Sequence, residues 1–193
     1  MNPFERPLQE ALDALEGVGI GYMIVGSFAS NLYGAPRATQ DVDIVVEPNL
    51  GKLSRLLSVL GTKGFYTPPM PVVERALHAE KPFNLIHIDT GFKVDLVPRR
   101  KRPFSAEEFS RRHYVEFLGK PRAFATPEDT LLAKLEWAKR GGSARQIEDA
   151  LAIVMGVGKL DREYLKKWAQ ELGVRELLEE VERKAERRQS EGV

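Results

Sequence analysis

The sequence contains no cysteine, only three histidines, and no apolar run near the ~20 residues that a membrane-spanning helix needs. The missing cysteines exclude a small secreted domain held together by disulfides. The three histidines stand far apart and do not indicate a zinc site. The N-terminal residues lack the basic-then-apolar order of a signal peptide, which favours a cytoplasmic protein with no membrane partner.

An excess of one charge sign is also lacking, since 29 basic and 28 acidic residues leave a formal net charge of +1. With 42% hydrophobic residues, this balance excludes an intrinsically disordered chain. The distribution is uneven, because residues 1–50 hold seven acids and two bases, whereas residues 93–145 hold thirteen bases and seven acids. Such asymmetry is typical of a cation or anion site, or of a basic patch for nucleic acid, but solvated faces also show it.

The spacing of apolar residues divides the chain into two parts. Up to about residue 125, short β-rich runs alternate with amphipathic helical segments, and the runs 83–89 and 92–97 predict a hairpin. After Thr126 and Pro127, which are typical of a helix start, the pattern is helical to the C-terminus. We therefore expect an α+β fold, with a mixed sheet flanked by helices in residues 1–125 and a C-terminal helical bundle in residues 126–193.

The run Asp41-Val42-Asp43-Ile44 carries the first chemical signal. Alternate residues of a strand share a face, so Asp41 and Asp43 should point the same way. Two carboxylates on one face repel each other, and a divalent cation between them would relieve this. Oxygen ligands without histidine or cysteine suit Mg²⁺ or Mn²⁺, although two solvated acids at a strand edge are the alternative.

Gly26 and Ser27 follow a predicted strand and open a predicted helix. The unpaired N–H groups and the dipole at a helix N-terminus favour an anion, so a phosphate is a candidate ligand there. An ordinary turn with a serine cap is the alternative. Arg37 and Thr39, shortly before Asp41, are further candidates for phosphate contact, but Arg37 could equally pair with a surface acid and Thr39 could stabilise the turn.

A third carboxylate is expected near Asp41 and Asp43. In the run 92–97, Lys93 and Asp95 share one strand face, and a neighbouring strand could bring Asp95 beside the other two aspartates. Three carboxylates can hold two metal ions for an in-line phosphoryl displacement, and Asp95 could also act as the general base on an incoming hydroxyl. Asp89 competes for this place, but the predicted hairpin turn disfavours it.

With these motifs, residues 20–97 resemble the nucleotidyltransferase superfamily of the DNA polymerase β type. The resemblance rests on Val25-Gly26-Ser27, on Asp41-Val42-Asp43-Ile44, and on Val94-Asp95-Leu96. It implies a nucleotidyltransferase-like sheet, an NTP as substrate, and ATP or another nucleotide held by Gly26 and Ser27. It also implies that Asp41, Asp43 and Asp95 are the catalytic residues and bind Mg²⁺.

A weaker similarity links the helical part to the abortive-infection type IV toxin nucleotidyltransferases. It lies in the run 134–140, which begins with Lys134 and ends with Arg140, and in the run 145–149, which ends with Asp149. The similarity implies that Lys134 faces the nucleotide triphosphate. It also makes a toxin–antitoxin role, with a cognate antitoxin or a homodimer as partner, an expectation to test.

The sequence thus predicts a metal-dependent nucleotidyltransferase that moves a nucleoside monophosphate from an NTP to a hydroxyl. The acceptor stays open between an RNA 3′ end such as that of tRNA, a protein and a small molecule, and the basic segment 93–145 favours an anionic acceptor. The alternative is a catalytically inactive module of this fold in a regulatory or toxin–antitoxin complex.

Overall fold

The computed structural model describes residues 3–34, 36 and 38–191. The chain forms two compact units, each made of two segments of the sequence. Unit 1 comprises Met1–Val25 and Thr39–Phe124, and unit 2 comprises Gly26–Ala38 and Ala125–Val193. The sequence-based division placed residues 26–38 in the first domain, whereas the helix Gly26–Tyr33 within them packs on the C-terminal helices.

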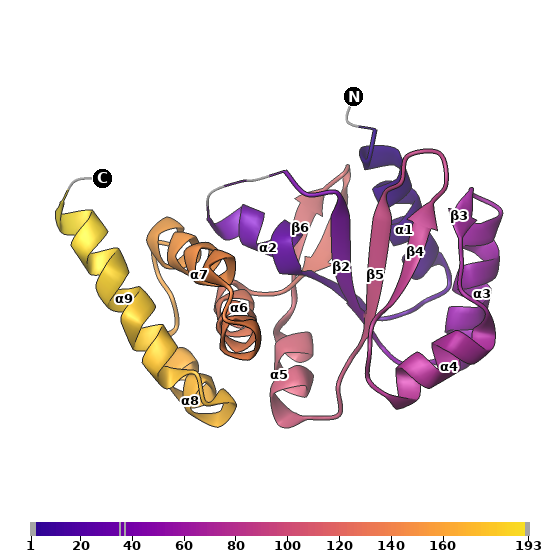
Figure 1. Cartoon of the computed structure of the whole chain (residues 1–193). Helices are drawn as coiled ribbons and strands as arrows, with labels where there is room; N and C mark the ends of the chain where they lie inside the picture. Colours follow the sequence, from indigo (N-terminus) through magenta and orange to yellow (C-terminus); the bar gives the residue numbers. More distant parts are fainter. Residues whose placement is uncertain (1–2, 35, 37, 192–193) are drawn as a thin grey trace. The chain divides into compact units, whose positions relative to one another are not determined.

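Unit 1 contains a mixed sheet that has seven strands within the described residues, in the order β3-β4-β5-β2-β1-β7-β6 (Figure 1). The pairs β2–β5 and β1–β7 are parallel, and the remaining neighbours are antiparallel. The strands are β1 (Tyr22–Val25), β2 (Asp41–Val46), β3 (Phe65–Tyr66), β4 (Phe83–His87), β5 (Lys93–Pro98), β6 (His113–Phe117) and β7 (Lys120–Phe124). The predicted mixed sheet and the hairpin of β4 and β5 are confirmed.

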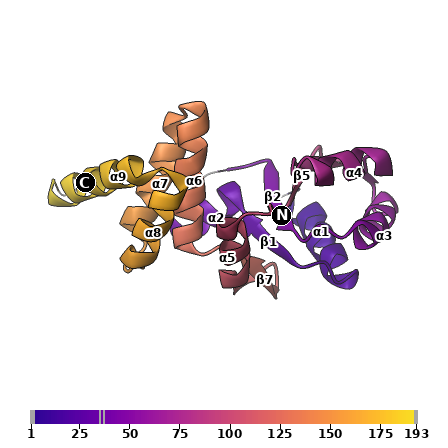
Figure 2. The same cartoon turned by 90° about the horizontal axis from the view of Figure 1, so that it is seen from below.

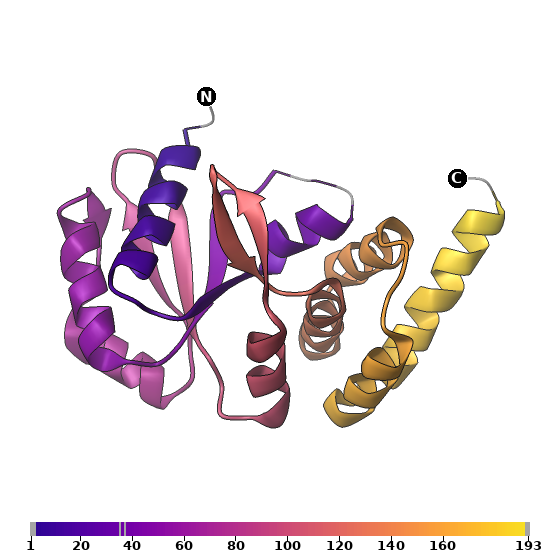
Figure 3. The same cartoon turned by 180° about the vertical axis from the view of Figure 1, so that it is seen from behind.

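The helices of unit 1 are α1 (Glu5–Gly17), α3 (Leu50–Gly61), α4 (Met70–His78) and α5 (Pro103–Arg111). Seen from behind, α1 and α3 lie across one face of the sheet (Figure 3). Both helices bury one apolar stripe, as their leucine spacing predicts. Helix α3 begins where the side chain of Asn49 accepts a hydrogen bond from the Lys52 backbone N–H.

The two faces of the central strands differ sharply in burial. On β2 and β5, Val42, Ile44, Val94 and Leu96 are at most 1% exposed and form the core beneath the helices. The residues between them alternate to the opposite face and are half-buried. That opposite face carries Asp41, Asp43, Lys93 and Asp95 on β2 and β5, and Asn84, Ile86 and Tyr66 further along the sheet. The polar residues are therefore gathered on one face by strand alternation.

The basic residues at positions 99–102 lead into α5, a helix that the sequence did not predict. The guanidinium groups of Arg99 and Arg112 lie over the ring of Phe109, and that of Arg102 lies over Phe104. The rings of Phe104 and Phe109 thus form contacts with three basic side chains at this helix. These arginines pack on the protein itself, as the solvated-face alternative allows for part of the basic segment.

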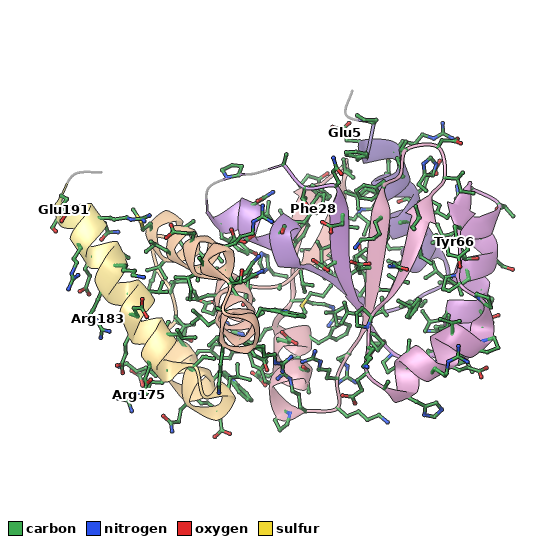
Figure 4. The ribbon with its side chains drawn as sticks, in the orientation of Figure 1. Glu5, Phe28, Tyr66, Arg175, Arg183 and Glu191 are labelled. Carbon is green, nitrogen blue, oxygen red and sulfur yellow. The ribbon has the colours of Figure 1, made fainter. Side chains whose placement is uncertain are left out.

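Unit 2 consists of α2 (Gly26–Tyr33), α6 (Pro127–Gly141), α7 (Ala144–Gly156), α8 (Arg162–Leu172) and α9 (Arg175–Ser190). Thr126 caps α6 by accepting a hydrogen bond from the Asp129 N–H, as the sequence predicts, and Asp161 caps α8 by accepting one from the Tyr164 N–H. Figure 2 shows these helices from below, and Figure 4 shows Arg175, Arg183 and Glu191 along the charged helix α9.

Helix α2 approaches α7 closely because glycine lies at the contact. A Cβ atom at Gly156 would stand 2.3 Å from the carbonyl oxygen of Tyr33, which no side chain could accept without movement. The hydroxyl of Tyr33 donates a hydrogen bond to the carbonyl of Ala125 over 2.7 Å. This close packing explains why α2 belongs to unit 2 despite its position early in the sequence. No described helix is long and apolar enough to cross a membrane.

Candidate active site

The parallel pairing of β2 and β5 places the three aspartates side by side. Asp43 is the register partner of Asp95, and Asp41 is the partner of Lys93 on the same strand pair. On the other side of β2, Asp43 pairs with Val25, the last residue of β1. The sequence expectation that a neighbouring strand brings Asp95 beside Asp43 is therefore confirmed. Asp89, the competing candidate, lies in the turn after β4.

Lys93 reaches into this group of carboxylates. Its Nζ lies 2.9 Å from Asp95 Oδ2 and 3.7 Å from Asp41 Oδ2. The pKa of Lys93 is raised, first by the hydrogen bond to Asp95 and further by the charges of Asp95, Asp41 and Asp43, against the opposing effect of burial. Sequence reasoning put Lys93 on the face of Asp95 but gave it no role, because its neighbours on β2 lie about fifty positions earlier in the chain.

Thr39 orients Asp41. The hydroxyl of Thr39 donates to Asp41 Oδ1 over 2.7 Å, and the same hydroxyl is 3.1 Å from the Asp41 carbonyl oxygen. This local turn fixes one carboxylate oxygen, while the other faces Lys93. Contact of Thr39 with a nucleotide stays a prediction, and Arg37 lies outside the described residues.

Gly26 has the backbone conformation that its residue type permits. Its φ angle of +62° is in the left-handed region, where a side chain would add strain. It directly follows Val25 at the end of β1 and begins α2, in which the Ser30 hydroxyl donates to the Ser27 carbonyl over 3.1 Å. The strand–glycine–helix order expected from sequence is present, and phosphate binding at Gly26 and Ser27 stays a prediction.

Lys134 is buried in unit 2 and is 5% exposed. Its Nζ lies 2.7 Å from Asp149 Oδ2, which joins α6 to α7. This ion pair uses one of the three N–H donors of the ammonium. The structure thus supports the pairing of these helices through Lys134 and Asp149, and the nucleotide contact of Lys134 stays a prediction.

A second cluster of charges in unit 1 was missed by sequence reasoning. The guanidinium of Arg122 is fully buried, with one nitrogen 2.6 Å from Asp13 Oδ1 and another 2.7 Å from Glu16 Oε1. Lys120 lies 2.8 Å from the same oxygen of Asp13, and the Tyr22 hydroxyl donates to Glu16 over 2.7 Å. Two bases and two acids thus neutralise each other between α1 and β7.

The chemistry of the aspartate group fits a hard divalent cation, since it offers only oxygen ligands on adjacent strands. As the side chains stand, no three histidine, cysteine, aspartate or glutamate residues within the described ranges converge to hold a metal ion. The Lys93 ammonium is near two of the three carboxylates instead. The backbone register suits such a site, but its side chains, Lys93 among them, would have to move.

Comparisons with known proteins identify the fold. Neither a family model nor a curated protein matches this sequence. An antigenic nucleotidyltransferase-like protein from Paracoccidioides brasiliensis superposes with a TM-score of 0.64 at 20% identity, over 97% of this chain and 92% of that one. The solution structure of the antibiotic-resistance factor ANT(2″)-Ia gives a TM-score of 0.55 at 12% identity, over 97% of each chain.

The same factor in complex with adenylyl-2″-tobramycin gives a TM-score of 0.57 at 13% identity, over 89% of this chain and 98% of that one. These identities are low, and the superpositions cover most of both chains. The agreement therefore concerns the path of the backbone, including the mixed sheet that carries the aspartates. From the strand order, the helices and these superpositions, we conclude that the chain has the fold of nucleotidyltransferase-like proteins.

Proposed function

We propose that this protein is a metal-dependent nucleotidyltransferase that moves a nucleoside monophosphate from an NTP to a hydroxyl and releases pyrophosphate. The observation that carries the proposal is the register that sets Asp43 beside Asp95 and Asp41 beside Lys93 on one half-buried face. Three acids on adjacent strands are costly to keep together unless a cation compensates them. A fold shared with nucleotidyltransferase-like proteins supports the same conclusion.

The roles of the residues follow from their positions. Asp41 and Asp43 would hold Mg²⁺ or Mn²⁺, with Thr39 fixing the direction of the Asp41 carboxylate. Asp95 would be the third ligand and would accept the proton of the acceptor hydroxyl. The backbone N–H groups after Gly26 would bind phosphate oxygens of the NTP. Bound Mg²⁺ would supply charge neutralisation of the triphosphate and of the leaving pyrophosphate.

The acceptor is a hydroxyl compound, and a small molecule is the first class to test. The complex of ANT(2″)-Ia with adenylyl-2″-tobramycin shows that this fold accommodates a nucleotidylated small molecule in another protein. An RNA 3′ end is favoured less than the charge of residues 93–145 alone suggests. Two bases of that segment, Arg122 and Lys134, are buried in ion pairs, and others stack on aromatic rings of α5.

The proposal is tested by incubating the protein with each α-³²P-labelled NTP, Mg²⁺, and separate fractions of RNA, protein and small molecules. We expect label to enter one fraction, and to be lost when Asp43→Asn replaces the wild type. Lys63→Met, at an exposed site outside the aspartate face, serves as the matched control and should retain the transfer.

The second candidate is a binding module of the same fold without transfer activity, for example in a toxin–antitoxin complex. It predicts metal-dependent binding of an NTP without label in any fraction. Absence of both labelling and nucleotide binding, with the fold intact by circular dichroism, would contradict both candidates.

A further inference from the structure

Lys93 places one positive charge among three carboxylates. Its Nζ contacts Asp95 Oδ2 at 2.9 Å and lies 3.7 Å from Asp41 Oδ2, and Asp43 also attracts it electrostatically. The lysine side chain is 36% exposed and that of Asp95 is 19% exposed, so the contact is partly shielded from water. The ammonium therefore compensates the carboxylate of Asp95 directly and that of Asp41 more weakly.

The backbone fixes this arrangement. Lys93 and Asp95 are alternate residues of β5, so both point to the face that Asp41 and Asp43 occupy on β2. The register partner of Lys93 is Asp41 itself, so the four-carbon stem needs to reach only across one pair of strands. The ammonium therefore lies where the fold directs it.

A divalent cation and this ammonium compete for the same oxygens. Mg²⁺ binds carboxylate oxygen directly, at about 2.0–2.1 Å, and tolerates little distortion of its ligands. Asp95 Oδ2, which the ammonium contacts, is one of the oxygens that such an ion would need. Two cations close together also repel each other strongly where water is partly excluded.

We propose that the Lys93 ammonium is a counter-ion of Asp95 and Asp41 in the metal-free protein, and that a divalent cation binds by displacing it. Lys93 is then a positioning residue that sets the metal concentration at which the face becomes occupied. This inference rests on the proposed function, because it assumes that Asp41, Asp43 and Asp95 bind the cation.

The test is a titration of the full chain with Mn²⁺, without nucleotide, in which free Mn²⁺ is followed by electron paramagnetic resonance. Lys93→Met keeps the length of the side chain and removes its charge. We expect it to bind Mn²⁺ about tenfold more tightly than the wild type, because the metal no longer competes with a neighbouring positive charge. Lys93→Arg, which retains the charge, should stay near the wild-type affinity, and the exposed-lysine control Lys63→Met should match it.

Thermal unfolding gives a second readout. Without metal, Lys93→Met should melt below the wild type, since Asp95 and Asp41 lose the nearby ammonium, and Mn²⁺ should raise its melting temperature more than that of the wild type. Circular dichroism at the titration temperature establishes that each variant is folded.

The outcomes separate this inference from the proposed function. If the wild type binds Mn²⁺ and Lys93→Met binds it with equal or lower affinity, displacement of the Lys93 ammonium is contradicted. The proposed metal site is still supported in that case. If neither folded protein binds Mn²⁺, the metal-dependent function is contradicted and the inference falls with it. Tighter Mn²⁺ binding by Lys93→Met, together with wild-type Mn²⁺ affinity in Lys93→Arg, would support both the metal site and the displacement of Lys93.

Discussion

Two groups of charged residues in unit 1 differ in their composition. Around Arg122, two bases face Asp13 and Glu16, and the fully buried guanidinium is paired with both acids. On β2 and β5, Lys93 lies 2.9 Å from Asp95 and 3.7 Å from Asp41, and Asp43 is the register partner of Asp95. The first group is charge-balanced, and its ion pairs link α1 to β7. The second group gathers three carboxylates on adjacent strands, which is the arrangement expected of a cation site.

The largest expected effect is on transfer activity at the aspartate group. Asp95→Asn removes a ligand and the base for the acceptor hydroxyl, so we expect the rate of nucleotidyl transfer to fall by more than about 100-fold. The free energy of unfolding should change little, because Asp95 lies on the half-buried face and asparagine has a similar shape. Single-turnover transfer and urea unfolding of the same preparation measure the two quantities, and a large loss of stability would point to a structural role instead.

The balanced group should respond in the opposite way. Arg122→Met leaves Asp13 and Glu16 without their buried partner, and we expect the free energy of unfolding to fall by about 3 kcal/mol. The Mn²⁺ affinity of the folded fraction should be unchanged, since Arg122 is not on the aspartate face. Urea denaturation and Mn²⁺ titration test this pair of results. An altered Mn²⁺ affinity would show that the two groups are coupled.

A smaller effect on stability is expected when the pH is lowered, and it comes from Asp13 in the group around Arg122. Burial alone would raise the pKa of Asp13, but the hydrogen bonds and charges of Lys120 and Arg122 together hold it below its usual range. Asp13 therefore stabilises the fold above its ordinary pKa of about 3.9, and this contribution disappears as pH falls through the lower folded value.

The difference in melting temperature between the wild type and Asp13→Asn should accordingly be full near neutral pH and shrink below about pH 4. Melting curves at a series of pH values measure it. A difference that stays constant down to acid unfolding would contradict the ion pairs of Asp13.

Local pattern in the sequence predicted much of the candidate site. Period-two alternation put Asp41 and Asp43 on one face, and the same alternation put Asp95 with Lys93. Glycine at position 26 indicated the turn between strand and helix, which its positive φ angle confirms. These features depend on residues that are close together in the sequence, so a local pattern is enough to predict them.

What the sequence did not predict depends on distant pairing. Arg122 meets Asp13 across 109 positions, and no local spacing connects them. The contact of Lys93 with Asp41 requires the parallel register of β2 and β5. Residues 26–38 were placed with the first domain because they follow β1 in the chain, whereas the close approach of Tyr33 to Gly156 groups them with the helices of unit 2.

The most direct measurement of the central claim is the shift in melting temperature that millimolar Mg²⁺ produces. It is compared between the wild type and the variants Asp13→Asn and Asp43→Asn. A cation site formed by Asp41, Asp43 and Asp95 predicts a rise for the wild type and for Asp13→Asn, because binding to the folded state stabilises it. It predicts loss of that rise for Asp43→Asn. No rise in the wild type, or an equal rise in Asp43→Asn, would contradict a cation site on this face.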